Sequence, residues 1–293
     1  MKIGLRIEVN TYRGTRDGVP RLMGLLKQFR AGATFLFSLG SDHTGRALGS
    51  LPRVPKMKCY GIGTLLSGTL LPGADIGARC RDVMRSVRQE GYEAGILALD
   101  RVRWLKRIAG AGEAWTAAEM RRARERYEDI FSAQALTHGA PGWRMNRYAY
   151  RYTQRLGYRH CSDTRGTGPF VPVVNGEIAA CPQLPTTLPT LDEMIGLDGV
   201  TEANVAEALL EKTKEPRDHV YTLHAELEGM KLAPVFDKLL AGWKSQGYEL
   251  VAMRDLVAAH GAANLPLHSV ADATVAGRSG TLACQSTPFL ADA

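Results

Sequence analysis

The order of apolar and polar positions along the chain predicts strands that alternate with helices. Apolar, strand-like segments recur seven times, at 2–9, 33–38, 94–99, 137–141, 158–162, 219–224 and 248–252. Between several of these segments the apolar residues return at helical spacing, as they do within 18–30. The amphipathic segments 202–214 and 233–245 are likewise predicted helices. Thr116 and Glu119 have the spacing of a capping box, which predicts a helix that runs from there to about 134.

This alternation of strand and helix favours an α/β fold in which a parallel sheet of about seven strands closes into a barrel. We find no linker, repeat or low-complexity tract, so residues 1–293 are expected to form one domain. Two insertions, at about 45–75 and 163–196, interrupt the pattern. The second contains five prolines and is expected to be an extended loop.

The first insertion mixes basic residues with apolar residues and glycines. Its basic residues are Arg46, Arg53, Lys56 and Lys58. This composition suits a segment that lies at the interface of an anionic membrane. It is equally compatible with an irregular loop that packs on the barrel.

Composition narrows the class of protein. The chain is 45% hydrophobic and 23% charged, which is ordinary for a soluble globular protein, and no apolar run is long enough to span a membrane. A net charge of +7 suggests an anionic partner, although the cluster from Arg121 to Arg126 is interpreted as a solvated helix face. Aromatic residues are not interleaved with the basic clusters, which argues against a nucleic-acid partner.

The cysteines and the start of the chain indicate a compartment. Five cysteines without metal spacing, and a strand-like start in place of a signal peptide, predict free thiols in the cytoplasm.

Charged and polar residues gather where the predicted strands end. On the first strand Arg6, Glu8 and Asn10 share one face, because strand side chains alternate with a period of two. Polar residues also follow the later strands: Asp100, Arg101, Arg144, Asp163, Arg165, His224, Glu226 and Glu228. Polar groups at the carboxyl ends of barrel strands are typical of an active site, and a histidine near a carboxylate could act as a general acid and base. Each charge taken alone could also be a structural ion pair. The seven histidines form no spacing typical of a metal site.

Several segments together resemble one enzyme family over nearly the whole chain. They are LRIEVNTYRGTRDGVPRL, GTLLPGADIG, PGWR, SDTRGTGPFVP, LPTTLPTLDEMIG, VYTLHAELEG and AGRSGTLACQ. These segments are similar to the NodB-type polysaccharide deacetylases, and within them to the deformylases that act on 4-deoxy-4-formamido-arabinose linked to undecaprenyl phosphate. The resemblance implies a distorted (β/α)7 barrel. It also implies hydrolysis of an amide on a lipid-linked sugar with a divalent metal such as zinc, manganese or cobalt.

The resemblance also assigns roles to positions of this chain. Glu8 stands at the place of the general base, and His224 at that of the general acid. Arg144, which in the family pairs with the base, and Asp163 complete the implied catalytic group. Implied substrate-binding positions are Arg13, Trp143, Arg165, Glu226 and Glu228. The three positions that hold the metal in the family carry Asn10, Leu97 and Arg101 here.

These three residues change the expected function. Leu97 has no ligand atom, and Arg101 is a permanent cation that would repel a metal ion. We therefore predict no cofactor, and a degenerate homologue that binds a lipid-linked aminosugar or related anionic glycolipid in peripheral contact with the inner face of the cytoplasmic membrane. Arg101, together with Arg144, would replace the metal's charge and neutralise Glu8.

Two alternatives remain open. The protein could be an active deformylase or deacetylase with a rebuilt site that uses Glu8, His224, Asp163 and either His138 or His160. It could also have an unrelated function on the same barrel.

Overall fold

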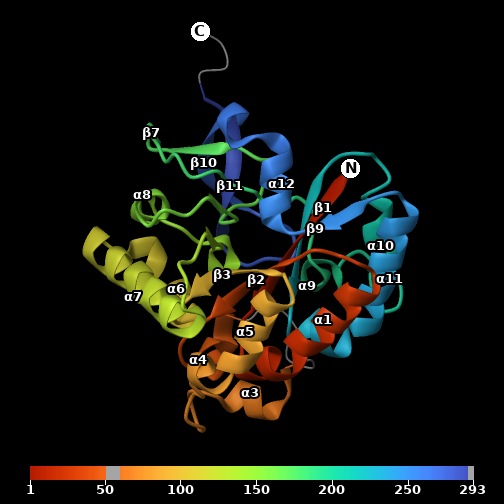
Figure 1. Ribbon diagram of the computed structural model, residues 1–293, viewed down its shortest axis with the longest axis horizontal. Coiled ribbons are helices and arrows are strands. Elements are labelled where there is room, and N and C mark those ends of the chain that lie inside the picture. Colours follow the sequence, from red (N-terminus) through yellow and green to blue (C-terminus); the bar gives the residue numbers. More distant parts are fainter. Residues whose placement is uncertain (51–59, 290–293) are drawn as a thin grey trace.

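A computed structural model describes residues 1–50 and 60–289 of the chain (Figure 1). Its main sheet has seven parallel strands, in the order β5-β4-β3-β2-β1-β8, with β9 also paired to β1. The strands are β1 (Lys2–Val9), β2 (Thr34–Ser38), β3 (Glu93–Ala98), β4 (Thr137–His138), β5 (His160–Cys161), β8 (His219–His224) and β9 (Glu249–Val251). All seven strands predicted from the sequence are present, and the predicted α/β barrel-type fold is confirmed.

Strand β1 is an interior strand that pairs with β2 on one side and with β8 and β9 on the other, and it is buried from Ile3 to Val9. Its odd-numbered residues are apolar and belong to the main hydrophobic core, which the surrounding helices complete. Its even-numbered residues point to the other face. There a smaller apolar cluster that includes Met253 and Leu256 packs against Gly4, below Arg6 and Glu8. The inner face of the barrel therefore changes from apolar to charged as β1 approaches its carboxyl end.

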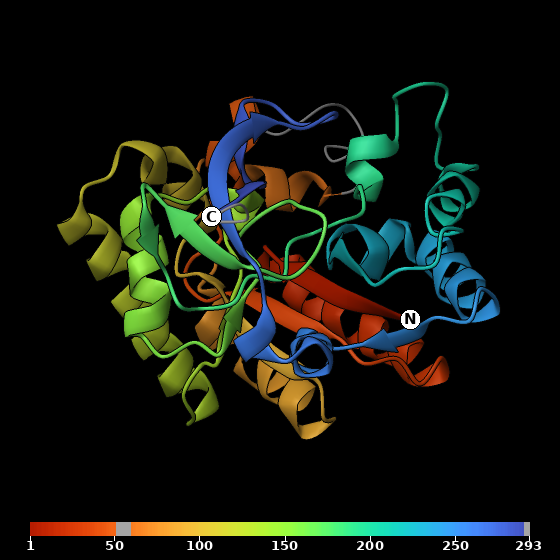
Figure 2. The same cartoon turned by 90° about the horizontal axis from the view of Figure 1, so that it is seen from above.

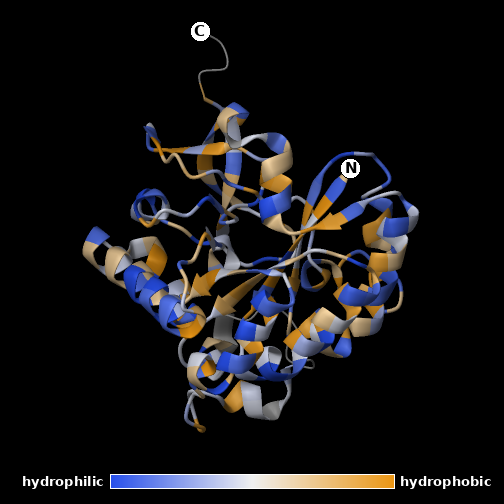
Figure 3. Cartoon of the chain, viewed as in Figure 1, coloured by the Kyte–Doolittle hydropathy of each residue, from blue (hydrophilic) through white to orange (hydrophobic). Residues whose placement is uncertain are grey.

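Helices follow most of the strands and cover the outer face of the sheet, as parallel strands require. They are α1 (Val19–Gln28), α3 (Ile62–Leu66), α4 (Ile76–Arg79), α5 (Arg81–Gln89), α6 (Arg101–Arg107), α7 (Glu113–Phe131), α8 (Arg147–Arg155), α9 (Leu191–Met194), α10 (Val205–Glu211), α11 (Ala233–Ser245) and α12 (Met253–His260). Figure 3 shows the central strands as mostly hydrophobic, whereas α7 carries both hydrophobic and hydrophilic residues.

The long helix α7 differs from its sequence prediction at its start. It begins at Glu113, after Gly112, so the capping box predicted at Thr116 and Glu119 is wrong. The Thr116 hydroxyl donates to the carbonyl of Gly112 inside the helix, and Glu119 is buried in ion pairs with Arg103 and Arg122. The other arginines of the 121–126 cluster are exposed or pair with carboxylates along the surface, which confirms the solvated-face interpretation.

A second sheet was not predicted from the sequence. It has the order β11-β10-β6-β7 and is formed by β6 (Val171–Val174), β7 (Glu177–Ile178), β10 (Leu267–Thr274) and β11 (Thr281–Pro288). In Figure 1 it occupies the upper part of the molecule, away from α3 to α5, and Figure 2 shows it from above. The segment 163–196, expected to be an extended loop, contributes β6, β7 and α9. The turn between β10 and β11 carries Arg278, which reaches the site described below.

Two sequence predictions fall partly outside the described residues. Arg53, Lys56 and Lys58 of the first insertion belong to the undescribed segment, as does Cys59. In the described part of the chain, four cysteines are free thiols, as predicted. None of the described helices combines the length and apolar character needed to cross a membrane.

Candidate functional site

The site forms where β1 and β8 end side by side. The register of these two parallel strands places Glu8 directly opposite His224, and Glu8 Oε2 lies 3.5 Å from His224 Nδ1. Both residues line a cavity of about 230 Å³. Of the residues predicted from the sequence, the cavity brings together Glu8, Asn10, Arg101, Trp143, Arg144 and His224.

Arg6 supplies the direct counter-charge to Glu8. Its Nη1 donates to Glu8 Oε1 at 2.6 Å, and both side chains are almost completely buried. Burial alone would raise the pKa of the Glu8 carboxyl, but Arg6 and His224 outweigh it and hold that pKa at about 2. Glu8 is therefore ionised at neutral pH.

The prediction that Arg144 pairs with Glu8 is wrong. Arg144 instead donates to the carbonyl oxygens of Leu105 and Ser279, at the wall of the cavity. Arg101 forms no ion pair with Glu8 either; the residues that lower the pKa of Glu8 most are Arg6, His224 and Arg278. The physical reason is proximity: Arg6 is two residues before Glu8 on the same strand face, so its guanidinium reaches the carboxylate without crossing the cavity.

Arg278 and Asp192 belong to the site but were missed as site residues from the sequence. Asp192 Oδ1 lies 3.4 Å from His224 Nε2, and its Oδ2 lies 3.3 Å from Arg278 Nη1. Arg278 also donates to Glu193, which in turn pairs with Arg165. Both missed residues lie in segments that carry the family resemblance, AGRSGTLACQ and LPTTLPTLDEMIG, and that was the available signal.

Trp143 is fully buried beneath three guanidinium groups. Those of Arg6, Arg165 and Arg278 lie 5.5, 4.8 and 5.0 Å from the centre of its ring. The indole Nε1 donates to Thr186, and the backbone of Trp143 has a φ of 52°, a value that bulky residues rarely adopt. Cation–π contact with several arginines stabilises this arrangement. Trp143 thus positions the cationic wall of the cavity.

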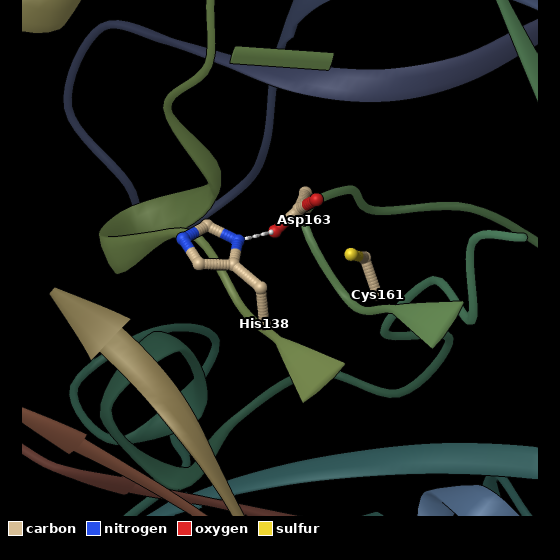
Figure 4. A group of neighbouring side chains, drawn as sticks. All are labelled: His138, Cys161 and Asp163. Carbon is tan, nitrogen blue, oxygen red and sulfur yellow. Dashed lines mark hydrogen bonds and ion pairs between the residues drawn. The ribbon is translucent and has the colours of Figure 1, made fainter. Parts of the chain in front are cut away.

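Asp163 lies apart from the cavity in a closed cluster with His138 and Cys161 (Figure 4). Ligand atoms of these three residues lie within 4.8 Å of one another, which raises the question of a metal site. However, Asp163 Oδ1 accepts from His138 Nδ1 at 2.7 Å and from the backbone of Ala140, while Oδ2 accepts from Gln183. Burial also raises the pKa of the Cys161 thiol, which disfavours the thiolate that binds metals. The cluster is a hydrogen-bonded support for the loop that carries Trp143 and Arg144.

Two glutamates hold the strand ends in place. Glu226 accepts hydrogen bonds from the backbone nitrogens of Asn10 and Thr11, so it fixes the turn after β1. Glu228 accepts from the backbone nitrogen of His224 and from the Tyr221 hydroxyl. Burial raises the pKa of Glu228 to about 7, although His224 opposes this shift. Glu226 and Glu228, predicted as substrate-binding, instead lie behind the cavity wall.

The remaining predicted residues lie elsewhere. Arg13 donates to the carbonyl of Tyr60 and borders a separate surface groove with Asp17 and Lys231. His160 faces Glu93, with 3.3 Å between Nε2 and Oε1, where β3 and β5 begin; this is the opposite end of the strands from the cavity. His160 therefore cannot assist Glu8 or His224.

The residues at the implied metal positions do not fit a metal ion. Leu97 is a fully buried aliphatic side chain, and Arg101 places a permanent positive charge in the cavity. Only Asn10 offers an oxygen, Oδ1, which is buried without a hydrogen-bond partner among the described residues. One neutral amide oxygen beside a guanidinium is not a donor set that retains a divalent cation.

Comparison with known proteins identifies relatives. Two curated proteins are named "Probable 4-deoxy-4-formamido-L-arabinose-phosphoundecaprenol deformylase ArnD". The one from Shewanella sediminis is 32% identical and covers 98% of this chain and 95% of its own length. The one from Wigglesworthia glossinidia brevipalpis is 30% identical, over 93% and 98% respectively. Among solved structures, a Mycobacterium smegmatis protein assigned to the polysaccharide deacetylases has a TM-score of 0.65 at 16% identity and 94% coverage of both chains, which shows a shared fold. No protein-family model matches the chain.

Proposed function

The chain belongs to the family of 4-deoxy-4-formamido-L-arabinose-phosphoundecaprenol deformylases, and on that premise we propose that it binds a lipid-linked aminosugar, or a related anionic glycolipid, without metal-dependent hydrolysis. The observation that carries the proposal is the guanidinium of Arg101 in the cavity, together with Leu97 and Asn10 at the other two ligand positions. A divalent metal in this family would activate water and polarise the amide. Here the cavity supplies a fixed cation that can attract an anion or an oxygen but cannot generate hydroxide.

Metal analysis and an activity assay test this proposal directly. Purified protein incubated with zinc, manganese or cobalt should retain less than stoichiometric metal and should release no formate from a formamido-sugar lipid. The matched variant restores the ligands through Asn10→Asp, Leu97→His and Arg101→His, and it should gain metal binding. A second variant adds Glu8→Asp to restore the shorter carboxylate. Formate release by the wild-type protein would overturn the proposal.

A second candidate function is hydrolysis of the amide without metal. It is favoured by the short distance between Glu8 and His224, which could act as base and acid. Glu8 is a weak base for this purpose, because Arg6 holds its pKa at about 2. The same formate assay without metal decides between the two functions. Loss of activity in His224→Gln, with the fold retained, would then assign the acid.

We further propose peripheral contact with the inner face of the cytoplasmic membrane, where a polyprenyl-phosphate ligand would be reached. In the described part of the first insertion Leu70 is 81% exposed and Leu71 is 47% exposed. Apolar residues beside basic ones favour an anionic interface. The double variant Leu70→Ser with Leu71→Ser should bind phosphatidylglycerol vesicles several-fold more weakly than the wild type. The control Ile178→Ser changes an exposed residue of the second sheet and should bind normally. Equal binding by all three proteins would overturn the contact.

A further inference from the structure

Arg101 differs from the other arginines of the site because it forms no ion pair with any carboxylate of the described residues. Arg6 pairs with Glu8, Arg165 with Glu193, and Arg278 with Asp192 and Glu193. Arg101 Nε and Nη2 are both buried, and no described residue accepts a hydrogen bond from either. Buried donors without acceptors are destabilising, so a side chain held in this state points to a role other than folding.

The two atoms also form a specific recognition edge. In a guanidinium group, Nε–H and one Nη–H point in the same direction and match two oxygens carried on a single atom. Arg16 of this protein shows the arrangement in use, because its Nε and Nη2 donate to the two carboxylate oxygens of Asp17 at 2.6 and 2.7 Å. Arg101 offers the same edge inside the cavity.

The charges around Arg101 favour an anion. Lys106 and Arg144 also line the cavity, and neither forms an ion pair with a carboxylate of the described residues. Glu8 is the one carboxylate among the described residues that line the cavity, and Arg6 neutralises it at 2.6 Å. The described cavity wall therefore carries three cations, Arg101, Lys106 and Arg144, that form no ion pair with a carboxylate of the same described residues.

We propose that Arg101 anchors an oxyanion-binding site at the place where its relatives are expected to hold a metal ion, and that the ligand enters with a phosphate or carboxylate group directed at this residue. Lys106 and Arg144 add positive charge around the bound group, while Leu105 and Leu282 provide apolar contact for the adjoining part of the ligand. The inference rests on the proposed function in that it concerns the same cavity and assumes binding without metal.

The experiment is isothermal titration of the whole protein at fixed ionic strength with inorganic phosphate, acetate and a short polyprenyl phosphate in detergent. The wild type should bind at least one of these oxyanions, and Arg101→Met should weaken that binding at least tenfold. Arg101→Lys keeps the charge but loses the two-donor edge, so it should fall between the two. The control Arg107→Met removes the same charge from the same helix, at an exposed residue that packs on Trp115, and should bind as the wild type does.

The ligands distinguish the source of the oxyanion. Polyprenyl phosphate that binds more than tenfold tighter than inorganic phosphate supports a lipid headgroup, and equal affinities support a small soluble anion. Absence of binding by all three ligands, or equal binding by Arg101→Met and the wild type, overturns the inference. Formate release by the wild type would overturn the proposed function and leave this inference to be decided by the titration alone.

Discussion

His224 and His138 each face a buried carboxylate at the carboxyl end of a strand, and the spaces beside the two pairs differ greatly in size. His224 lies 3.5 Å from Glu8 at the end of β8, and both line the cavity of about 230 Å³. His138 lies 2.7 Å from Asp163 at the end of β4, and it borders a space of only about 10 Å³. The pair with the shorter distance, His138 and Asp163, therefore borders a space too small for a ligand.

The difference between these pairs lies in their remaining partners. The Asp163 carboxylate accepts hydrogen bonds from His138, Ala140 and Gln183, so groups of the protein itself stabilise its charge. Around the cavity, His224 Nε2 lies 3.4 Å from Asp192 Oδ1, which is longer than an ordinary hydrogen bond, and Asn10 Oδ1 is buried with no hydrogen-bond partner among the described residues. Buried polar groups whose hydrogen bonds are all made stabilise a fold. Buried polar groups around a cavity that lack hydrogen-bond partners indicate a binding site. Substitutions in the two regions should therefore differ in their effects on stability and on binding.

Arg6→Leu should have the largest effect, because it leaves the Glu8 carboxylate buried and without its closest partner. We expect a loss of about 3–5 kcal/mol in the free energy of unfolding, measured by urea denaturation at pH 7. The double variant Arg6→Leu with Glu8→Leu should recover part of this loss, since no buried charge remains unpaired. A single variant as stable as the wild type would show that Glu8 is compensated by other cations.

Glu228 should make stability depend on pH near neutrality. Its folded pKa of about 7 lies above the ordinary 4.5, so the protonated carboxyl favours the folded state. That contribution is complete below pH 4.5 and is lost as the pH rises through 7. Between pH 4 and 8 the wild type should lose about 3 kcal/mol relative to Glu228→Gln, which lacks the titration. Parallel pH profiles of the two proteins in urea denaturation would contradict the assignment.

Asp163→Asn tests the closed pair. The NH2 group of the asparagine would face at least one group that now donates a hydrogen bond to Asp163, such as His138 or Gln183. Because that hydrogen bond is lost, we expect a decrease of about 1–3 kcal/mol in the free energy of unfolding. Phosphate affinity in the titration described above should remain within twofold of the wild type. A tenfold change in phosphate affinity with little change in stability would place Asp163 in the binding site. The regions around the Glu8–His224 and His138–Asp163 pairs would then not differ in function.

His224→Gln should have the smallest effect on stability. The His224 ring borders the cavity, and its contacts with Asp192 at 3.4 Å and Glu8 at 3.5 Å are longer than ordinary hydrogen bonds, so the expected cost is about 1 kcal/mol or less in thermal or urea unfolding. Its matched counterpart, His138→Gln, should cost more because it breaks the bond to Asp163. The reverse order would indicate that the His224 region is the structural one.

The amino-acid sequence alone was sufficient to indicate the family and the parallel α/β fold. Apolar periodicity marked all seven strands of the main sheet, and the family resemblance assigned Asn10, Leu97 and Arg101 to the positions at which a metal would be held. The period of two along β1 also placed Glu8 and Asn10 on the face that borders the cavity.

The ion pairs between charged side chains became known only from the three-dimensional arrangement of the chain. Arg6 takes the place predicted for Arg144, Asp163 turns away into a closed cluster, and Arg278 arrives from a hairpin far along the chain. Ion pairing depends on distances between side chains that are remote in sequence, and spacing along the chain does not encode those distances. The same holds for Arg101: the resemblance places a cation at an implied metal position, but only the fold shows that its Nε and Nη2 are buried with no acceptor among the described residues.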